Sequence, residues 1–268
     1  LVAVTGYFGD RMAEMLRRQG ATVLKVTAPV GDAPGPQRVA EAVETHRAAG
    51  PLKALFATHV DTSTGVLLDP EPLAAVAREH GLLSVFDGVC ATGGETFRMA
   101  DWGADVYLTG SQKALGAPPG LSLLVMSRRA LEVRKQRAAP APPMYLDWLE
   151  WLPIMEAYEA RRVGYFGTPA VNLIWALNVS LGQILDEGMD ARFARHRRMS
   201  QALKAAVTAL GMKQVPVSPE KSATTLTAPY FPAGMDRAML GYAKEAGVIL
   251  AGGLHPEIKA RYFRVGHM

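Results

Sequence analysis

The chain has 268 residues, of which 49% are hydrophobic and 20% charged, and its mean hydropathy is +0.06. This composition is typical of an ordinary globular protein, long enough for one large core with a smaller appended lobe. No run of eighteen apolar residues occurs, which excludes a membrane-spanning helix. The single cysteine excludes an internal disulfide framework and indicates a reducing, intracellular compartment.

The formal net charge is +4, and the densest basic run is ARFARHRR at residues 191–198. Aromatic residues are not interleaved in this run as they are where a protein stacks on nucleic-acid bases. We interpret the run as the solvated face of a helix with Phe193 turned inward, and we expect no nucleic-acid partner. A mild positive balance suits anionic ligands such as a phosphate or an oxo acid.

In the first half of the chain, short apolar runs alternate with amphipathic segments. The expected strands are residues 1–4, 21–26, 53–58, 82–86, 104–109 and 121–126. The expected helices are residues 11–19, 37–48, 70–80 and 128–137. Such alternation implies right-handed crossovers, and it predicts an α/β fold with a mostly parallel sheet and helices on both faces.

The composition changes from residue 140, where a Pro/Ala run precedes an aromatic-rich segment at residues 145–160. We interpret this segment as a lobe edge or an interface, since several aromatic residues in one place often mark a partner surface. Long helices are expected next, followed by a small C-terminal α/β lobe. Its predicted elements are helices 170–187, 192–211 and 236–246 and strands 224–228 and 248–250. We place the domain boundary between residues 1–165 and 166–268.

Two expected strands end in polar side chains that could bind a ligand. The apolar run 82–86 ends in Asp87, and the run 104–109 is followed by Gln112, Lys113 and a Gly/Pro loop. In open α/β sheets, ligands bind at the carboxyl edge, where such strand ends meet. A neutral lysine and a carboxylate at this edge suit an aldehyde cofactor that needs an amine at one end and an anion at the other. Taken singly, the acid could be a turn former and the lysine a solvated side chain.

The segments D-G-V-C-A-T-G-G-E at residues 87–95 and G-S-Q-K-A-L-G-A-P-P-G at residues 110–120 resemble the class V, fold-type I aminotransferases. Among these, the chain is most similar to alanine–glyoxylate and serine–pyruvate aminotransferases. The resemblance implies pyridoxal 5′-phosphate as cofactor, a mostly parallel sheet of the seven-stranded type, and small amino acids and 2-oxo acids as substrates. It assigns the Schiff-base lysine to Lys113 and the partner of the pyridine nitrogen to Asp87.

The resemblance also implies roles for residues outside these two segments. The aromatic residue that stacks on the cofactor, often Trp in the family, falls on Phe8. Residues 59–66 resemble the family's T-H-x-E-T-S-T-G-V segment, whose first hydroxyl residue contacts the cofactor, and this role falls on Thr62. Val89 and Gln112, which lie beside the two central residues, complete the cofactor contacts expected within one chain.

Two further roles concern a neighbouring subunit and the substrate. Tyr165 and Thr168 match the family's pair that reaches the cofactor phosphate of the other subunit, which implies a homodimer with shared sites. Thr168, followed by a proline, also has the pattern of a helix N-cap. Arg264 matches the arginine that clamps the substrate carboxylate, and we expect Arg261 to be solvated.

The alternatives within this fold are another chemistry on the same cofactor, either desulfuration or decarboxylation, and a non-catalytic protein. Cysteine desulfurases place a histidine directly before the lysine and use a cysteine on a mobile C-terminal loop, whereas this chain has Gln112 and a single Cys90 near Asp87. A non-catalytic protein of the same fold would not be expected to keep Asp87, Lys113 and Arg264. The family also has an N-terminal phosphate-binding segment, which we expect to precede residue 1.

Overall fold

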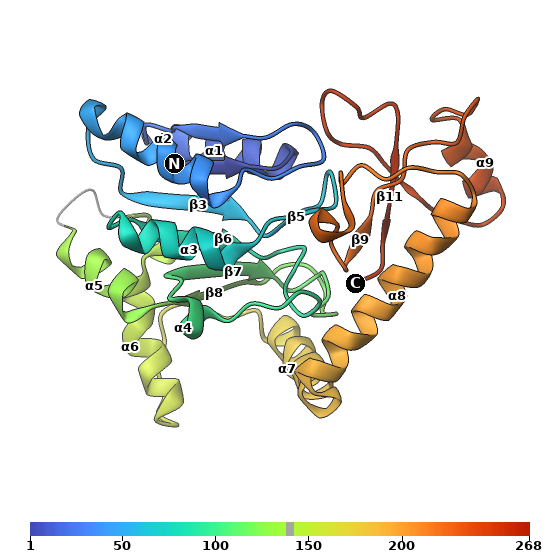
Figure 1. Cartoon of the computed structure of the whole chain (residues 1–268). Helices are drawn as coiled ribbons and strands as arrows, with labels where there is room; N and C mark the ends of the chain where they lie inside the picture. Colours follow the sequence, from blue (N-terminus) through green and yellow to red (C-terminus); the bar gives the residue numbers. More distant parts are fainter. Residues whose placement is uncertain (138–141) are drawn as a thin grey trace.

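The computed structural model describes residues 1–137 and 142–268, and its centre is a six-stranded sheet in the order β2-β1-β3-β6-β7-β8 (Figure 1). The first five of these strands are parallel, and β8 runs antiparallel to β7. The α/β architecture with a mostly parallel sheet is therefore confirmed, with six strands in the described residues. The strands are β1 (Val2–Val4), β2 (Lys25–Thr27), β3 (Ala54–Thr58), β6 (Leu83–Asp87), β7 (Val106–Gly110) and β8 (Ser122–Met126).

Helices cover both faces of the sheet because successive strand residues point to opposite sides. Leu55 and Phe86 pack with α2 and α3, whereas Phe56 packs on the other face with α1. Val85, on that same face, packs with α5 and the start of α6. The helices of the first half are α1 (Tyr7–Arg18), α2 (Pro36–His46), α3 (Pro70–Glu79), the short α4 (Met99–Trp102) and α5 (Arg128–Gln136).

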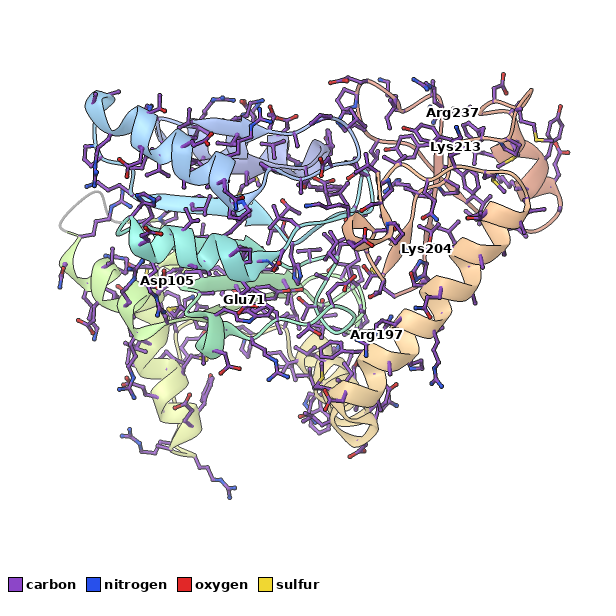
Figure 2. The ribbon with its side chains drawn as sticks, in the orientation of Figure 1. Glu71, Asp105, Arg197, Lys204, Lys213 and Arg237 are labelled. Carbon is purple, nitrogen blue, oxygen red and sulfur yellow. The ribbon has the colours of Figure 1, made fainter. Side chains whose placement is uncertain are left out.

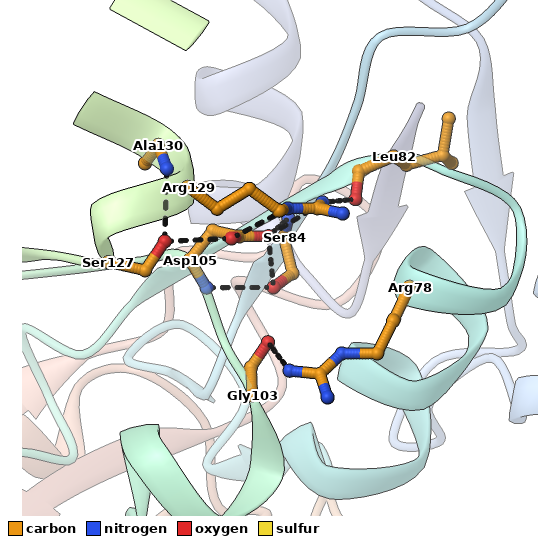
Figure 3. Close-up of polar contacts among 8 residues, drawn as sticks. All are labelled: Arg78, Leu82, Ser84, Gly103, Asp105, Ser127, Arg129 and Ala130. Carbon is orange, nitrogen blue, oxygen red and sulfur yellow. Dashed lines mark hydrogen bonds and ion pairs between the residues drawn. The ribbon is translucent and has the colours of Figure 1, made fainter. Parts of the chain in front are cut away.

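At the amino ends of the central strands, a buried polar network fixes the sheet edge (Figure 3). Asp105, only 4% exposed, accepts hydrogen bonds from the Ser84 backbone amide at 3.0 Å and from the Ser127 hydroxyl at 2.9 Å. The Arg129 guanidinium donates to the same carboxylate and to the Leu82 carbonyl. The Asp105 carboxylate thus joins β6, β7 and the turn between β8 and α5. It holds the relative positions of the two strands whose carboxyl ends lie at the opposite edge of the sheet.

The second half of the chain consists of long helices and a small lobe. Helices α6 (Trp148–Glu159), α7 (Val171–Glu187) and α8 (Met189–Ala209) lead to a three-stranded antiparallel sheet in the order β10-β11-β9. Figure 2 shows Lys204 on the side of α8 turned toward β9, where its ammonium donates to the Ser222 and Ala223 carbonyls. The remaining elements are β4 (Val60–Asp61), β5 (Val66–Leu67), β9 (Leu226–Thr227), α9 (Met239–Glu245), β10 (Ala251–Gly252) and β11 (Phe263–Gly266).

Several predicted elements differ from those observed. The strand expected at residues 248–250 forms at Ala251–Gly252, because the Val248 amide is held by the Ala243 carbonyl at the end of α9. The aromatic segment contains helix α6, which tolerates Pro153 within it. In the part of the chain that the structure describes, no helix has both the length and the apolar surface needed to cross a bilayer.

Candidate active site

The carboxyl ends of four parallel strands bring together most of the residues singled out from the sequence. Phe8 follows β1, Thr62 follows the short strand β4 just beyond β3, and Asp87 is the last residue of β6. Lys113 lies three residues beyond β7, after Gln112. Asp87 stands opposite Thr58 of β3 and Leu108 of β7 in the sheet register. The strand-end residues therefore lie on one edge of the sheet, which faces the small lobe (Figure 1).

Asp87 is held by the turn that it begins. Its Oδ1 accepts a hydrogen bond from the Val89 backbone amide at 2.9 Å. Burial raises the pKa of Asp87 above its ordinary value, and the nearby Asp61 carboxylate raises it further. A carboxylate in such surroundings is stabilised by a cationic partner, and its orientation is already set by the Val89 amide.

The residue after Asp87 explains why the turn is rigid. A Cβ on Gly88 would lie 2.1 Å from atoms of the Tyr107 ring, so that only glycine fits. The Gly88 amide donates to the Leu108 carbonyl, and its carbonyl accepts from the Thr92 hydroxyl at 2.7 Å. These contacts fix the direction in which the Asp87 side chain leaves the sheet.

The loop that carries Lys113 closes on itself through backbone and hydroxyl contacts. The Ser111 hydroxyl donates to the Pro118 carbonyl at 2.6 Å, and the Gly116 amide donates to the Lys113 carbonyl at 2.8 Å. Gly116 has φ +73°, a left-handed conformation that favours glycine. The Lys113 side chain is half-buried and forms no ion pair within residues 1–137 and 142–268, whereas Gln112 is exposed. The loop backbone at Lys113 is thus fixed, while the Lys113 amine has no ion-pair partner in these residues.

Arg192, expected on a solvated helix face, instead joins the two loops of the site. Its side chain is 12% exposed, its Nε donates to the Gly93 carbonyl at 2.9 Å, and its Nη2 donates to the Ala114 carbonyl. Nη1 pairs with Glu187 at 3.0 Å. The solvated-face interpretation of the basic run was therefore wrong for Arg192, and also for His196, which is 2% exposed.

Phe8 lies in the first turn of α1, which starts four residues earlier than predicted. Gly6 is the N-cap and has no side chain to cap the helix. The capping group comes from the loop after β3, where Asp61 Oδ2 accepts from the Phe8 amide at 3.1 Å and from the Gly9 amide at 3.2 Å. Phe8 is half-buried, and its ring packs edge-to-face on Tyr7 at 5.3 Å.

The small lobe contributes Arg264 to this edge. Its Nε donates to the Gly252 carbonyl at 2.8 Å, and its Nη1 donates to the Thr62 carbonyl at 3.1 Å. Partial burial lowers the pKa of Arg264, which nevertheless stays cationic at neutral pH. Arg261 is exposed and lies over the Tyr230 ring, as expected for the solvated arginine of the two.

Tyr165 and Thr168 lie elsewhere on the chain, between α6 and α7. Both are exposed, and their hydroxyl oxygens are 3.4 Å apart. Thr168 is not the N-cap of α7: Ala170 occupies that position, with no side-chain cap. In the described parts of the chain, no hydrogen bond joins either residue to Asp87, Lys113 or Arg264.

Cys90 is 2% exposed, and its sulfur lies 3.9 Å from the Thr225 hydroxyl oxygen. Burial raises the pKa of its thiol, so the reactive thiolate is disfavoured. This environment does not suit a cysteine that must reach a substrate sulfur on a mobile loop.

Three residues of this region were missed by sequence reasoning: Asp61, Arg192 and Tyr262. Asp61 had the one available signal, an acid inside a buried hydroxyl-rich loop directly after a strand. Tyr262 is fully buried, and its hydroxyl donates to the Ser63 carbonyl and accepts from the Leu254 and His255 amides. Neither Tyr262 nor Arg192 has a local pattern that would distinguish it.

Comparison with known proteins agrees with this arrangement. The family model described as Aminotransferase class-V matches residues 10–265. The chain is 38% identical over 279 residues to alanine–glyoxylate aminotransferase 1 of Saccharomyces cerevisiae, covering 100% of this chain and 70% of that protein. Among solved structures, alanine–glyoxylate aminotransferase from Nostoc sp. has a TM-score of 0.90 at 32% identity, covering 100% of this chain and 69% of that one.

A cysteine desulfurase from Thermococcus onnurineus has a TM-score of 0.69 at 15% identity, covering 96% of this chain and 64% of that one, which shows a shared fold alone. The chain spans about 70% of the length of the yeast relative. Because the family model covers nearly the whole chain and the yeast relative aligns along all of it, the chain belongs to the class V aminotransferases.

Proposed function

We propose that this protein transfers an amino group from a small amino acid, such as alanine or serine, to a small 2-oxo acid, such as glyoxylate or pyruvate, with pyridoxal 5′-phosphate as cofactor. The observation that carries the proposal is the sheet edge at which Asp87, Lys113 and Arg264 gather. The names of the relatives support the substrate class, since the yeast and Nostoc proteins are both alanine–glyoxylate aminotransferases.

The side chains at this edge fit the proposed cofactor. Asp87 Oδ1 is bonded to the Val89 amide, and no hydrogen bond engages Oδ2 within residues 1–137 and 142–268, which leaves one oxygen for a protonated ring nitrogen. Lys113 has no ion-pair partner in the same residues, which leaves its amine available to a cofactor aldehyde. Phe8 offers an aromatic face at the start of α1.

Each residue has a distinct chemical task. When bound, pyridoxal phosphate supplies an aldehyde and a ring that accepts the electron pair left when the substrate loses its α-proton. Asp87 keeps a proton on the ring nitrogen, which makes the ring a better electron acceptor. The neutral amine of Lys113 removes the proton from the substrate Cα and returns one in the later step. Arg264 binds the substrate carboxylate through its planar guanidinium and so orients Cα.

The proposed function is tested by titrating the purified protein with pyridoxal phosphate and then supplying alanine and glyoxylate. We expect saturable binding with a shift in the cofactor absorbance, followed by formation of pyruvate and glycine in equal amounts. Binding without product, or no saturable binding, would contradict the proposal. Release of alanine or sulfide from cysteine would instead identify a desulfurase.

Arg264→Lys is expected to raise the KM for amino acids roughly 10- to 100-fold, because lysine does not reproduce a two-pronged hydrogen bond worth about 1.5–3 kcal/mol. Pyridoxal phosphate affinity should change little. Initial-rate kinetics with alanine measure the effect, and half-reactions with a simple alkylamine serve as the control. An equal loss for the alkylamine, which has no carboxylate, would show that Arg264 does not bind the substrate carboxylate.

The active site is proposed to be completed by a second copy of the chain. Tyr165 is 73% exposed, Val163 is 99% exposed and Trp175 on α7 is 69% exposed, so that apolar side chains surround the pair expected to reach the partner's cofactor phosphate. An exposed apolar surface of this kind suits a permanent interface between subunits.

Mixing two inactive proteins tests the shared site. Chains with Tyr165→Phe and Thr168→Ala are expected to bind the cofactor phosphate weakly, and Lys113→Ala chains lack the catalytic amine. Mixed dimers pair the intact Lys113 of one chain with the intact Tyr165 and Thr168 of the other, so activity should reappear after unfolding and refolding together. If the mixture stays as inactive as its components, the site is built from one chain.

A further inference from the structure

Asp61 is a fully buried carboxylate for which the proposed reaction gives no role. It is 0% exposed, and its hydrogen-bond partners are all neutral groups: the Phe8, Gly9 and Ser63 amides and the Ser63 hydroxyl. Burial raises the pKa of Asp61, which shows that the surroundings disfavour its charge. A buried carboxylate whose oxygens accept only from neutral donors is tolerated only while those donors stay in place, so Asp61 and the segments that supply its donors depend on each other.

The two oxygens of Asp61 engage two different segments. Oδ2 accepts from the Phe8 amide at 3.1 Å and the Gly9 amide at 3.2 Å, in the first turn of α1. Oδ1 accepts from the Ser63 amide at 2.9 Å and the Ser63 hydroxyl at 2.5 Å, and the Ser63 hydroxyl oxygen accepts from the Tyr7 amide at 2.9 Å. The start of α1 and the loop after β3 are therefore joined by one carboxylate and one hydroxyl.

The junction leaves no room for a side chain at Gly6, and an amide in place of the Asp61 carboxylate would lose hydrogen bonds. A Cβ on Gly6 would lie 2.5 Å from the Ser63 hydroxyl oxygen and 2.8 Å from the Asp61 carboxyl carbon. The amides at the start of α1 have no hydrogen-bond partner within the helix, and they carry a partial positive charge that a carboxylate stabilises. An amide side chain of the same size would turn its NH2 group toward backbone N–H donors on one side or the other, and would lose that side's hydrogen bonds.

The same loop also reaches the residue proposed to bind substrate. Thr62 lies between Asp61 and Ser63, and its carbonyl accepts from Arg264 Nη1 at 3.1 Å. The next carbonyl, that of Ser63, accepts from the Tyr262 hydroxyl, which in turn holds the Leu254 and His255 amides at 2.9 Å. Anything that loosens Asp61 therefore disturbs both the aromatic residue and the carbonyl on which Arg264 rests.

We propose that Asp61 is a positioning residue of the active site, which fixes Phe8 against the cofactor ring and, through the loop it organises, holds Arg264 at the substrate carboxylate. This inference rests on the proposed function for the identity of the cofactor and substrate. The electrostatics of Arg264 agree with it: burial lowers the pKa of Arg264, and the Asp61 carboxylate opposes that lowering and so helps the guanidinium to stay cationic.

The test compares Asp61→Asn with Asp69→Ala. Asp69 caps α3 by accepting from the Glu71 amide at 3.2 Å, at an exposed position, so its replacement removes a helix cap outside the site. The first measurement is amide hydrogen exchange in the cofactor-free protein. In Asp61→Asn we expect either the Phe8 and Gly9 amides or the Ser63 amide, whichever faces the NH2 group, to exchange at least about tenfold faster, because a lost hydrogen bond of this strength corresponds to such a factor. In Asp69→Ala all three amides should exchange at the wild-type rate.

The second measurement is the visible circular dichroism of bound pyridoxal phosphate together with the KM for alanine. Asp61→Asn should weaken the dichroism and raise the KM, whereas Asp69→Ala should change neither. Ser63→Ala removes only the hydroxyl, and it should change the exchange rates, the dichroism and the KM in the same direction but by less. This variant replaces Asp61→Asn in the test if Asp61→Asn does not fold. Wild-type exchange rates in Asp61→Asn, or in Ser63→Ala where that variant is used, would overturn the proposal, as would unchanged dichroism and KM. Failure of the wild-type protein to bind pyridoxal phosphate would instead contradict the proposed function.

Discussion

Lys113→Ala is expected to reduce turnover by about 10⁴-fold or more, since it removes both the nucleophilic amine and the base that moves the α-proton. The fold should be unaffected. The Lys113 carbonyl accepts from the Gly116 amide, and this backbone contact is kept in the variant. The Lys113 side chain forms no ion pair in the described residues that the substitution could remove. We therefore expect the melting temperature of the cofactor-free protein to stay within a few degrees of the wild-type value.

The measurement is the steady-state rate with alanine and glyoxylate, together with mass spectrometry after borohydride reduction of the cofactor-loaded protein. The wild-type protein should retain the cofactor covalently at Lys113, and the variant should not. Lys113→Arg keeps the positive charge but provides no amine nucleophile, and should be as inactive as Lys113→Ala. Lys135→Ala, which removes an exposed lysine paired with Glu132, is the control for loss of a surface charge. A Lys113→Ala protein with normal turnover would refute the assignment.

The sheet and its functional edge could be predicted because the relevant signals are local. The apolar run 82–86 ends in an acid, and the run 104–109 leads to Lys113 within a few residues. Strand alternation with helices fixes the parallel order, and the carboxyl ends of parallel strands share one edge. The order of elements therefore predicted that Asp87 and Lys113 share one edge, whereas Phe8 and Thr62 were indicated only by the family resemblance.

The contacts that hold this edge together could not be predicted because they join distant parts of the chain. The start of α1 depends on Asp61, which is 53 residues from Phe8, and no pattern near Gly6 indicates it. Arg192 holds the Gly93 and Ala114 carbonyls, 99 and 78 residues away, although its neighbours suggest a solvated run. Thr168 has the local pattern of an N-cap, but its hydroxyl lies by that of Tyr165 and α7 starts later. In each case a tertiary contact outweighs the local preference.

Asp87 illustrates how the requirements of catalysis and of stability conflict at one residue. Its pKa is raised chiefly by burial, which means that the cofactor-free fold disfavours the charged form relative to the unfolded chain. A carboxyl group whose pKa is higher in the folded than in the unfolded state adds stability at low pH and loses that contribution as the pH rises through the folded pKa. At neutral pH the ionised Asp87 is therefore destabilising until a cationic partner binds. Functional sites commonly retain such groups at a cost in stability.

Asp87→Asn should accordingly separate the two effects. We expect a slightly higher melting temperature of the cofactor-free protein at neutral pH, because the neutral amide fits the buried position without a charge. We also expect the α-proton step to slow by roughly 10²–10³-fold, since a neutral amide cannot hold the proton on the ring nitrogen. Cofactor affinity should fall less than this rate, because the other contacts remain. Single-turnover kinetics with alanine and with α-deuterated alanine measure the step: the isotope effect should grow in the variant as proton removal becomes rate-limiting. Single-turnover rates that agree within a few-fold, with an unchanged isotope effect, would show that Asp87 serves the turn at the end of β6 and not the chemistry.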